Sequence, residues 1–323
     1  MEAVHKSIQE TRRLLATART YALYSDTLTE RILRVMNEDA LTQSHKIGKG
    51  DPSALENMRA AWAYASDNFT GRLSHHFITE IAGRIFPDNG FKYREVRLGR
   101  ERPGRPAGDL YLYCSPEKIG ERMEELLDYV ATSPNDPILK AADFHFAYVT
   151  IQPMKQAHKR TARFLQNLYL LHQGIPPALI PYAERNTYYA LLAAAQEAYK
   201  DRVAFGKLRY DSVRSPAEQH FLEYLVDKTK AGAEEHGAIV KAQKMYRIDA
   251  DIRGSSKRGV DALRNVLKRT FRAHGVIAEI IPNYEAEQLL VVSSVPEELI
   301  IGALYKNKPA YVKSVTVSDV SKG

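Results

Sequence analysis

Residues 152–163 combine side-chain types that could bind a phosphate or another anion. They read Gln-Pro-Met-Lys-Gln-Ala-His-Lys-Arg-Thr-Ala-Arg. Residues 157–159 are predicted to begin a helix, and the unpaired backbone N–H groups of a first helical turn favour an anion. Arg160 and Arg163 add two permanent positive charges nearby. In an arbitrary chain an Arg-x-x-Arg pair is more often a solvated helix face, so this pair alone does not define a site.

The elements that would position this segment are mostly helices. Apolar residues recur at helical spacing on both sides of it, and start signals such as Ser115 followed by Pro116 mark helix beginnings. Residues 87–116 are instead rich in Gly and Pro around the stretches KYREVRL and DLYLYCS, which predicts a β-hairpin with a basic tip. The predicted helices are 3–36 (one or two), 52–66, 73–86, 115–131, 137–150, 158–173, 183–201 and 216–230, with a loop at 46–53.

The hydrophobic period changes near the C-terminal end of the chain. MYRIDADIR at 245–253 alternates, and a capped helix, two short β-rich runs, another helix and a last strand follow it. The order β-α-β-β-α-β is that of a small ferredoxin-like α+β unit. We therefore place a domain boundary within residues 235–243.

The segment around Gln152 resembles the central motif of the Fic family, including its death-on-curing branch. That motif is usually His-Pro-Phe-x-Asp/Glu-Gly/Ala-Asn-Gly/Lys-Arg-x-x-Arg, and five positions match: Pro153, Ala157, Lys159, Arg160 and Arg163. The neighbouring predicted helices and hairpin also stand where the family has its own, so the resemblance covers roughly residues 53–230. It implies a mainly helical Fic domain with a hairpin flap at 53–235. A helical extension at 1–52 precedes it, and an α+β domain at 243–323 follows.

The resemblance implies a chemistry for which two residue types are missing. Fic enzymes transfer a nucleotide monophosphate, or another phosphate-containing group, from a bound cofactor to a hydroxyl of a target side chain. The motif His is the base for that hydroxyl, but Gln152 stands in its place, and an amide has no useful basicity. The motif acid holds magnesium, but Gln156 replaces it with a neutral, weaker ligand. The motif Asn is replaced by His158, and the motif Phe by Met154.

These replacements favour a degenerate active site. We therefore expect a pseudoenzyme that binds a partner or a nucleotide such as ATP, and a site that binds magnesium only weakly. Two alternatives stay open: an active protein adenylyltransferase or phosphotransferase that uses His158 as a displaced base, and a nucleic-acid-binding regulator. The positions assigned to phosphate or nucleotide binding are Gln156, Ala157, His158, Lys159, Arg160 and Arg163.

Two further features of the family have counterparts here. His145, in DFHF, stands where the family tends to carry a histidine, and we interpret it as a core residue. Many members carry an inhibitory Ser/Thr-x-x-x-Glu-Gly/Asn segment. Its nearest match is the stretch 66–71, with Thr70 at the position of the Glu.

Two basic segments suggest partners. The hairpin region 91–114 would align a target protein or peptide by analogy with the family, and its cations are Lys92, Arg94, Arg97, Arg100, Arg102 and Arg105. The helix expected after Ser255 could contact nucleic acid, and its cations are Lys257, Arg258, Arg264, Lys268, Arg269 and Arg272. A homo-oligomer is also compatible with the sequence.

Composition excludes several classes of protein. The 323 residues are 44% hydrophobic and 26% charged, which is ordinary globular usage. No apolar run approaches the ~18 residues of a membrane span, and no secretory signal is visible, so we expect a cytoplasmic protein. Cys114, the single cysteine, cannot form an intramolecular disulfide. The net charge of +7 permits nucleic-acid binding without requiring it.

Overall fold

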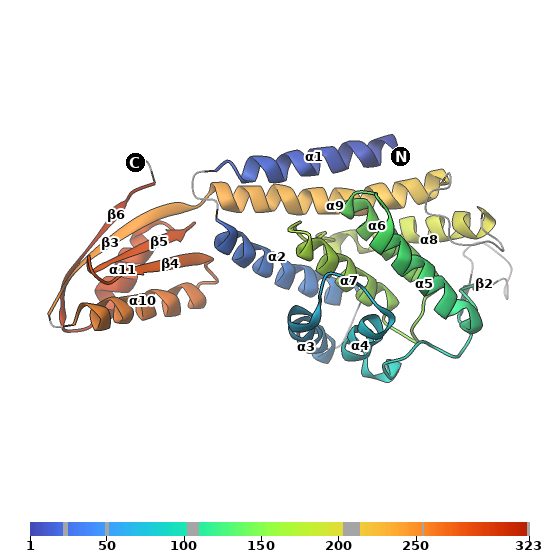
Figure 1. The fold of residues 1–323 in the computed structure, drawn as a ribbon, viewed down its shortest axis with the longest axis horizontal. Helices are drawn as coiled ribbons and strands as arrows, with labels where there is room; N and C mark the ends of the chain where they lie inside the picture. Colours follow the sequence, from blue (N-terminus) through green and yellow to red (C-terminus); the bar gives the residue numbers. More distant parts are fainter. Residues whose placement is uncertain (22–24, 49–51, 102–109, 203–213, 254, 322–323) are drawn as a thin grey trace. The chain divides into compact units, whose positions relative to one another are not determined.

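The fold is mainly helical, with a small antiparallel sheet near the C-terminal end (Figure 1). The computed structural model describes residues 1–323 except 22–24, 49–51, 102–109, 203–213, 254 and 322–323. The chain divides into two compact units. The first contains 1–13 and 36–233, and the second contains 14–35 and 234–323. The division into 1–52, 53–235 and 243–323 stays a prediction.

Most of the helices lie before residue 242. Local signals explain where several of them begin: Ser74 accepts from the N–H of Phe77, and Asp136 accepts from the N–H of Ile138. Their bounds are α1 Glu2–Ala18, α2 Asp26–Ile47, α3 Pro52–Asn68, α4 His75–Ile85, α5 Pro116–Thr132, α6 Pro137–Ile151, α7 His158–His172, α8 Arg185–Arg202 and α9 Pro216–Lys241, with short 3-10 helices at Pro87–Asn89 and Tyr182–Glu184.

Helices α6 and α7 form the centre of the first unit. Every residue of α6 from 141 to 151 is buried, and so is every residue of α7 from 161 to 170. The loop 152–157 joins the two helices, which pack against each other. The candidate motif is therefore built on the most buried pair of helices in this unit.

The hairpin exists but begins later than predicted. Its strands are β1 Gly99–Glu101 and β2 Leu110–Leu112, paired antiparallel with Gly99 opposite Leu112. The prediction of a strand at 92–98 is wrong, because the side chain of Arg94 is buried among loop carbonyl groups there. The predicted basic tip, with Arg102 and Arg105, falls within 102–109 and so lies outside the described residues.

Two helices are longer than the sequence indicated. Helix α2 continues through the end predicted at residue 36, because Ala40, Leu41, Ser44 and Ile47 are buried at helical spacing. Helix α9 runs through most of the predicted 235–243 linker.

The second unit contains the strands and helices in the predicted β-α-β-β-α-β order. They are β3 Lys244–Ile252, α10 Ser256–Ala273, β4 Ala278–Asn283, β5 Gln288–Ser293, α11 Glu297–Asn307 and β6 Val312–Asp319. The sheet order is β4-β5-β3-β6, with every neighbouring pair antiparallel. The apolar stripe of α10, including Val260, Leu263 and Phe271, packs in the core with Ile248 and Val291.

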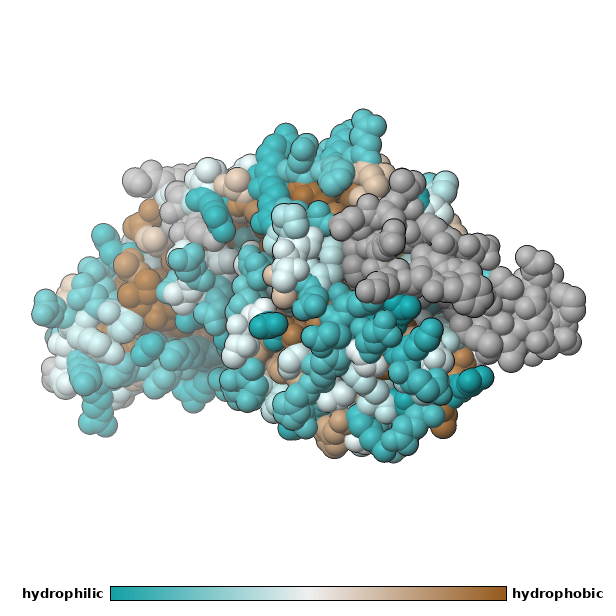
Figure 2. Space-filling model, turned by 45° about the vertical axis from the view of Figure 1, so that its right-hand side comes forward, coloured by the Kyte–Doolittle hydropathy of each residue, from teal (hydrophilic) through white to brown (hydrophobic). Residues whose placement is uncertain are grey.

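The face drawn in Figure 2 is largely hydrophilic, with small separate hydrophobic patches. Scattered apolar residues of this kind are normal on protein surfaces. Among the described residues, no helix combines the length and the apolar character that crossing a membrane requires.

Candidate functional site

The loop between α6 and α7 begins and ends with residues in the left-handed backbone region. Gln152 has φ 50° and Ala157 has φ 60°, a conformation that is uncommon for residues other than glycine. The turn at Gln152 ends α6, and the turn at Ala157 starts α7. The N–H groups of the first turn of α7 have no partner within the helix, and N–H groups of this kind favour an anion.

Two residues far away in the sequence hold this loop in place. The amide of Asn89, which is fully buried, donates to the carbonyl oxygen of Gln156 at 3.3 Å and accepts from its N–H at 3.0 Å. The Nε of Arg94 donates to the carbonyl oxygen of Gln152 at 2.7 Å, and its backbone N–H donates to that of Pro153 at 2.8 Å. Arg94 was predicted to be a surface cation of the hairpin, but it is 2% exposed and fixes the motif loop.

The two glutamines of the motif lie in different surroundings. Gln152 is buried, and its side-chain amide hydrogen-bonds the hydroxyl of Tyr113. Gln156 is exposed. Neither amide can take up a proton near neutral pH, and the Gln156 amide is a neutral ligand where Mg²⁺ prefers charged oxygen.

The two histidines near the motif are both uncharged at neutral pH. Burial, followed by the charges of Lys159 and Arg94, lowers the pKa of His158 to about 3. Such a ring is a much weaker base than a general base suited to neutral pH. His145 is a core residue, as interpreted from the sequence. It is bonded to Gln166 and Tyr188, and burial lowers its pKa to about 3.

The side chains at the start of α7 form a cluster of positive charge. The cluster also includes Arg185 of α8, which the sequence did not indicate. Burial lowers the pKa of Lys159, and the charges of Arg163, Arg100 and Arg185 lower it further. Lys159 and Arg185 both lie over the ring of Tyr189, at 5.2 and 4.9 Å from its centre. Within the described part of the chain, no carboxylate forms an ion pair with Lys159, Arg163 or Arg185. The cluster therefore carries positive charge that could be balanced by an anion.

The end of α2 contacts this cluster with uncharged groups. Arg163 is 4% exposed and donates to the hydroxyl of Ser44 at 2.9 Å and to its carbonyl oxygen at 3.1 Å. Arg185 donates to the carbonyl oxygen of Ile47 at 2.9 Å. At Gly48 a Cβ atom would lie only 3.0 Å from Cδ and Nε of Arg160, so glycine permits this close approach.

The predicted inhibitory segment 66–71 does not lie at the arginines. Gly71 contacts the ring of His172, at the opposite end of α7 from Arg160 and Arg163. The prediction for Thr70 is therefore wrong, and the segment around Ser44 contacts Arg163 instead. The helical spacing of apolar residues before Ser44 was the signal that could have extended α2 into the site.

Comparison with known proteins agrees with the position of this site. The model of the Fic/DOC family matches residues 72–170. "Protein adenylyltransferase fic-1" of Caenorhabditis elegans is 34% identical over 103 residues, which cover 31% of this chain and 20% of that protein. "Protein adenylyltransferase Fic" of Drosophila yakuba is 34% identical over 119 residues, 36% of this chain and 23% of that protein. The matched region thus spans about a fifth of the length of these relatives.

Solved structures show the same fold at low sequence identity. Fic-1 from C. elegans, residues 134–508, aligns with a TM-score of 0.55 and 19% identity over 73% of each chain. A Fic family protein from Desulfovibrio desulfuricans aligns with a TM-score of 0.52 and 14% identity, over 92% of this chain and 98% of that one. The family match at residues 72–170 includes α6, the motif loop and most of α7. Residues 72–170 of this chain match the Fic/DOC family, and solved structures of Fic proteins share its fold.

Proposed function

We propose that this protein binds the phosphate groups of a nucleotide at the start of α7 and does not transfer them efficiently. The observation that carries the proposal is the cluster of Lys159, Arg163 and Arg185, for which no carboxylate partner lies among the described residues. Arg160 lies beside it, against Gly48. Positive side chains grouped at a helix N-terminus are a recurrent arrangement for phosphate binding.

The contacts of α2 are compatible with an incoming phosphate. The oxygen atoms of α2 that accept from Arg163 and Arg185, those of Ser44 and Ile47, are uncharged. A phosphate would therefore compete with neutral acceptors, and hydrogen bonds to charged acceptors are about twice as strong as neutral ones. The names of the two relatives, protein adenylyltransferase, favour ATP as the nucleotide to test first.

The absence of efficient transfer follows from the residue types in the loop. Gln152 cannot deprotonate a hydroxyl, and the pKa of about 3 makes the ring of His158 a poor substitute. Gln156 offers a neutral oxygen to Mg²⁺, whose ordinary role is to neutralise charge on the phosphates. The residues present therefore fit the nucleotide phosphates but not the metal. The alternative, an active adenylyltransferase or phosphotransferase with His158 as its base, needs that ring to become more basic when substrate binds.

Titration calorimetry with ATP tests the binding site. We expect the wild-type protein to bind ATP and Arg160→Ala to bind it at least about tenfold more weakly, a loss of ~1.4 kcal/mol. Arg13→Ala removes one exposed positive charge from α1 and is the matched control, so it should bind ATP as the wild type does. Equal affinities in the wild type and Arg160→Ala would contradict the site.

A target protein is proposed as the partner of the hairpin region 91–114. Its described strands, β1 and β2, form a two-stranded sheet to which an extended peptide could add a strand. The cations of this region are partly occupied already, since Lys92 pairs with Glu95 at 2.8 Å and Arg100 with Glu197 at 3.2 Å.

A second candidate function is nucleic-acid binding by the C-terminal unit, which we propose to be ferredoxin-like on the basis of its strand order. Its support is α10, where no cation forms an ion pair with a described residue. Five of these cations are also exposed: Lys257, Arg258, Lys268, Arg269 and Arg272.

Changing Lys268, Arg269 and Arg272 to Gln should reduce the salt dependence of RNA or DNA affinity by about one ion per lost phosphate contact. If the triple variant left the salt dependence of affinity unchanged, this function would be contradicted. The same holds if the control Lys118→Gln lowered the salt dependence as much as the triple variant does.

A further inference from the structure

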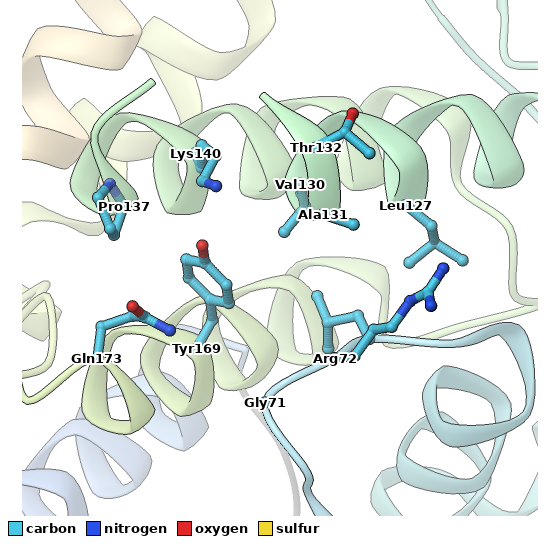
Figure 3. Close-up of a pocket in the computed structure, with 11 residues that line it drawn as sticks. Gly71, Arg72, Leu127, Val130, Ala131, Thr132, Pro137, Lys140, Tyr169 and Gln173 are labelled. Atoms are coloured by element: carbon cyan, nitrogen blue, oxygen red, sulfur yellow. The ribbon is translucent and has the colours of Figure 1, made fainter. Parts of the chain in front are cut away.

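A cavity lies at the opposite end of α7 from the motif. It is bounded by the loop before α4, the last turns of α5, the first turn of α6 and the end of α7, and its volume is about 530 Å³ (Figure 3). Tyr169, in the last turn of α7, and Gln173, the residue that follows this helix, line it. Along the axis of α7, Tyr169 lies six residues, or about 9 Å, beyond Arg163, and no residue of the phosphate cluster lines the cavity. It is thus separate from the site of the proposed function.

The polar side chains of this cavity favour a negative charge. Figure 3 shows the ammonium group of Lys140 and the guanidinium group of Arg72 on opposite sides of the space between the helices. Arg72 is exposed and forms no ion pair with a described residue. Lys140 donates one hydrogen bond, to the carbonyl oxygen of Ser133 at 3.1 Å, and an ammonium group has three donors. None of the described residues that line the cavity carries a carboxylate.

The acidic group that precedes α6 leaves this positive charge in place. Asp136 caps α6 and forms an ion pair with Arg12 at 3.0 Å. Burial, together with the charge of Asp136, raises the pKa of the Tyr169 hydroxyl. Tyr169 is therefore a neutral phenol at ordinary pH, and Figure 3 shows its hydroxyl directed toward Lys140. A phenol in this position can donate a hydrogen bond to an anion.

Apolar side chains form another part of the wall. Leu73 comes from the loop before α4, and Leu127, Val130 and Ala131 come from the last turns of α5. Cavities of about 300–1,000 Å³ with an apolar lining and a few polar groups are typical small-molecule sites. The combination here suits a ligand with one charged end and one apolar body.

The loop that carries Arg72 is fixed against α7. Gly71 has φ 91°, and a Cβ atom there would lie 2.3 Å from Nε2 of His172, so only glycine allows this contact. The ring of Phe69 packs at 5.2 Å from the rings of both His172 and Phe77. The Arg72 backbone is therefore positioned before any ligand arrives, which lowers the entropy cost of binding.

We propose that this cavity binds a small organic anion, a carboxylate or a phosphate monoester with a short apolar body. Lys140 and the hydroxyl of Tyr169 bind its charged end, and Arg72 adds positive charge from the other side of the cavity. Leu73, Leu127 and Val130 contact its apolar body. Carboxylate and phosphate share this chemistry, and the two are distinguished by comparing their affinities.

Calorimetry on the full chain tests the proposal with 3-phenylpropanoate, phenyl phosphate and the neutral 3-phenylpropanamide. We expect at least one anion to bind at millimolar concentration or below, and the amide to bind at least about tenfold more weakly. Arg72→Gln and Lys140→Met should each weaken binding of that anion about tenfold. Lys118→Met, which removes an exposed cation at the start of α5, should bind as the wild type does.

Three outcomes would overturn the proposal. They are no binding of either anion at millimolar concentration, equal binding of the amide, and unchanged affinity in both Arg72→Gln and Lys140→Met. Because Arg72 is exposed, its variant is expected to fold whatever happens to the Lys140 variant. Arg160→Ala should bind the anion normally, so failure at this cavity and failure of the phosphate cluster give different results.

Discussion

Replacing Gln152 with His and Gln156 with Asp in the same chain is expected to raise the rate of adenylylation far above that of the wild-type protein. The change restores a base that titrates near neutral pH and a charged ligand for magnesium. A positioned base alone contributes typically ~10²–10⁴ to a rate. We therefore expect the double variant to incorporate label from ATP labelled at the α-phosphate, in the presence of magnesium, at least about a hundredfold faster than the wild type.

The two single variants and a matched pair complete this experiment. Gln152→His without a carboxylate at 156 should regain less activity than the double variant. Gln152→Asn with Gln156→Asn changes the same positions without adding a base or a charge, so it should stay inactive. Efficient transfer by the wild type, lost in the double variant, would mean that the native residues perform a rearranged reaction and that the protein is not a pseudoenzyme.

Replacing Arg94 with Met is expected to destabilise the first unit by at least about 3 kcal/mol, because a buried acceptor that loses its partner costs about 1–3 kcal/mol. The guanidinium group donates to the carbonyl oxygens of Gln152, Val96 and Cys114. Methionine fills a similar volume but leaves these oxygens without their donor. Urea unfolding followed by circular dichroism measures the change.

Two further variants separate the hydrogen bonds of Arg94 from its charge. Arg94→Lys keeps the charge but cannot reproduce the planar set of donors, so it should lose most of the same stability. Arg97→Met removes an exposed arginine three residues later and should change stability by less than about 0.5 kcal/mol. If Arg94→Met and Arg97→Met lost the same stability, Arg94 would not be the residue that fixes the motif loop.

The helices were predictable because their signals are local. Ser74 and Asp136 cap the helices that follow them, and the apolar stripe of α10 repeats at helical spacing. The short hairpin strands were harder to place. Alternation at 92–98 indicated a strand, but long-range hydrogen bonds from Arg94 to the motif loop determine the backbone there. Tertiary contacts of this kind leave no periodic signal in the sequence.

The residues of the candidate site were also predictable where the signal is local, and not where the contacts are long-range. Lys159, Arg160 and Arg163 were predicted because they lie in one short segment whose pattern resembles a family motif. Ser44 and Arg185 were missed, since 119 residues separate Ser44 from the arginine that it contacts. A buried polar serine at helical spacing looks like any other helix residue. Only the folded chain shows that its oxygen atoms face an arginine.

Calorimetric titration of ATP into the wild-type protein, with and without magnesium, tests the account most directly. The cluster at the start of α7 acts through positive side chains, and Gln156 supplies no charged ligand for the metal. Free ATP carries more negative charge than its magnesium complex, so we expect it to bind at least as tightly when magnesium is absent. ATP binding that requires magnesium, or no binding under either condition, would contradict a phosphate site built from Lys159, Arg160, Arg163 and Arg185.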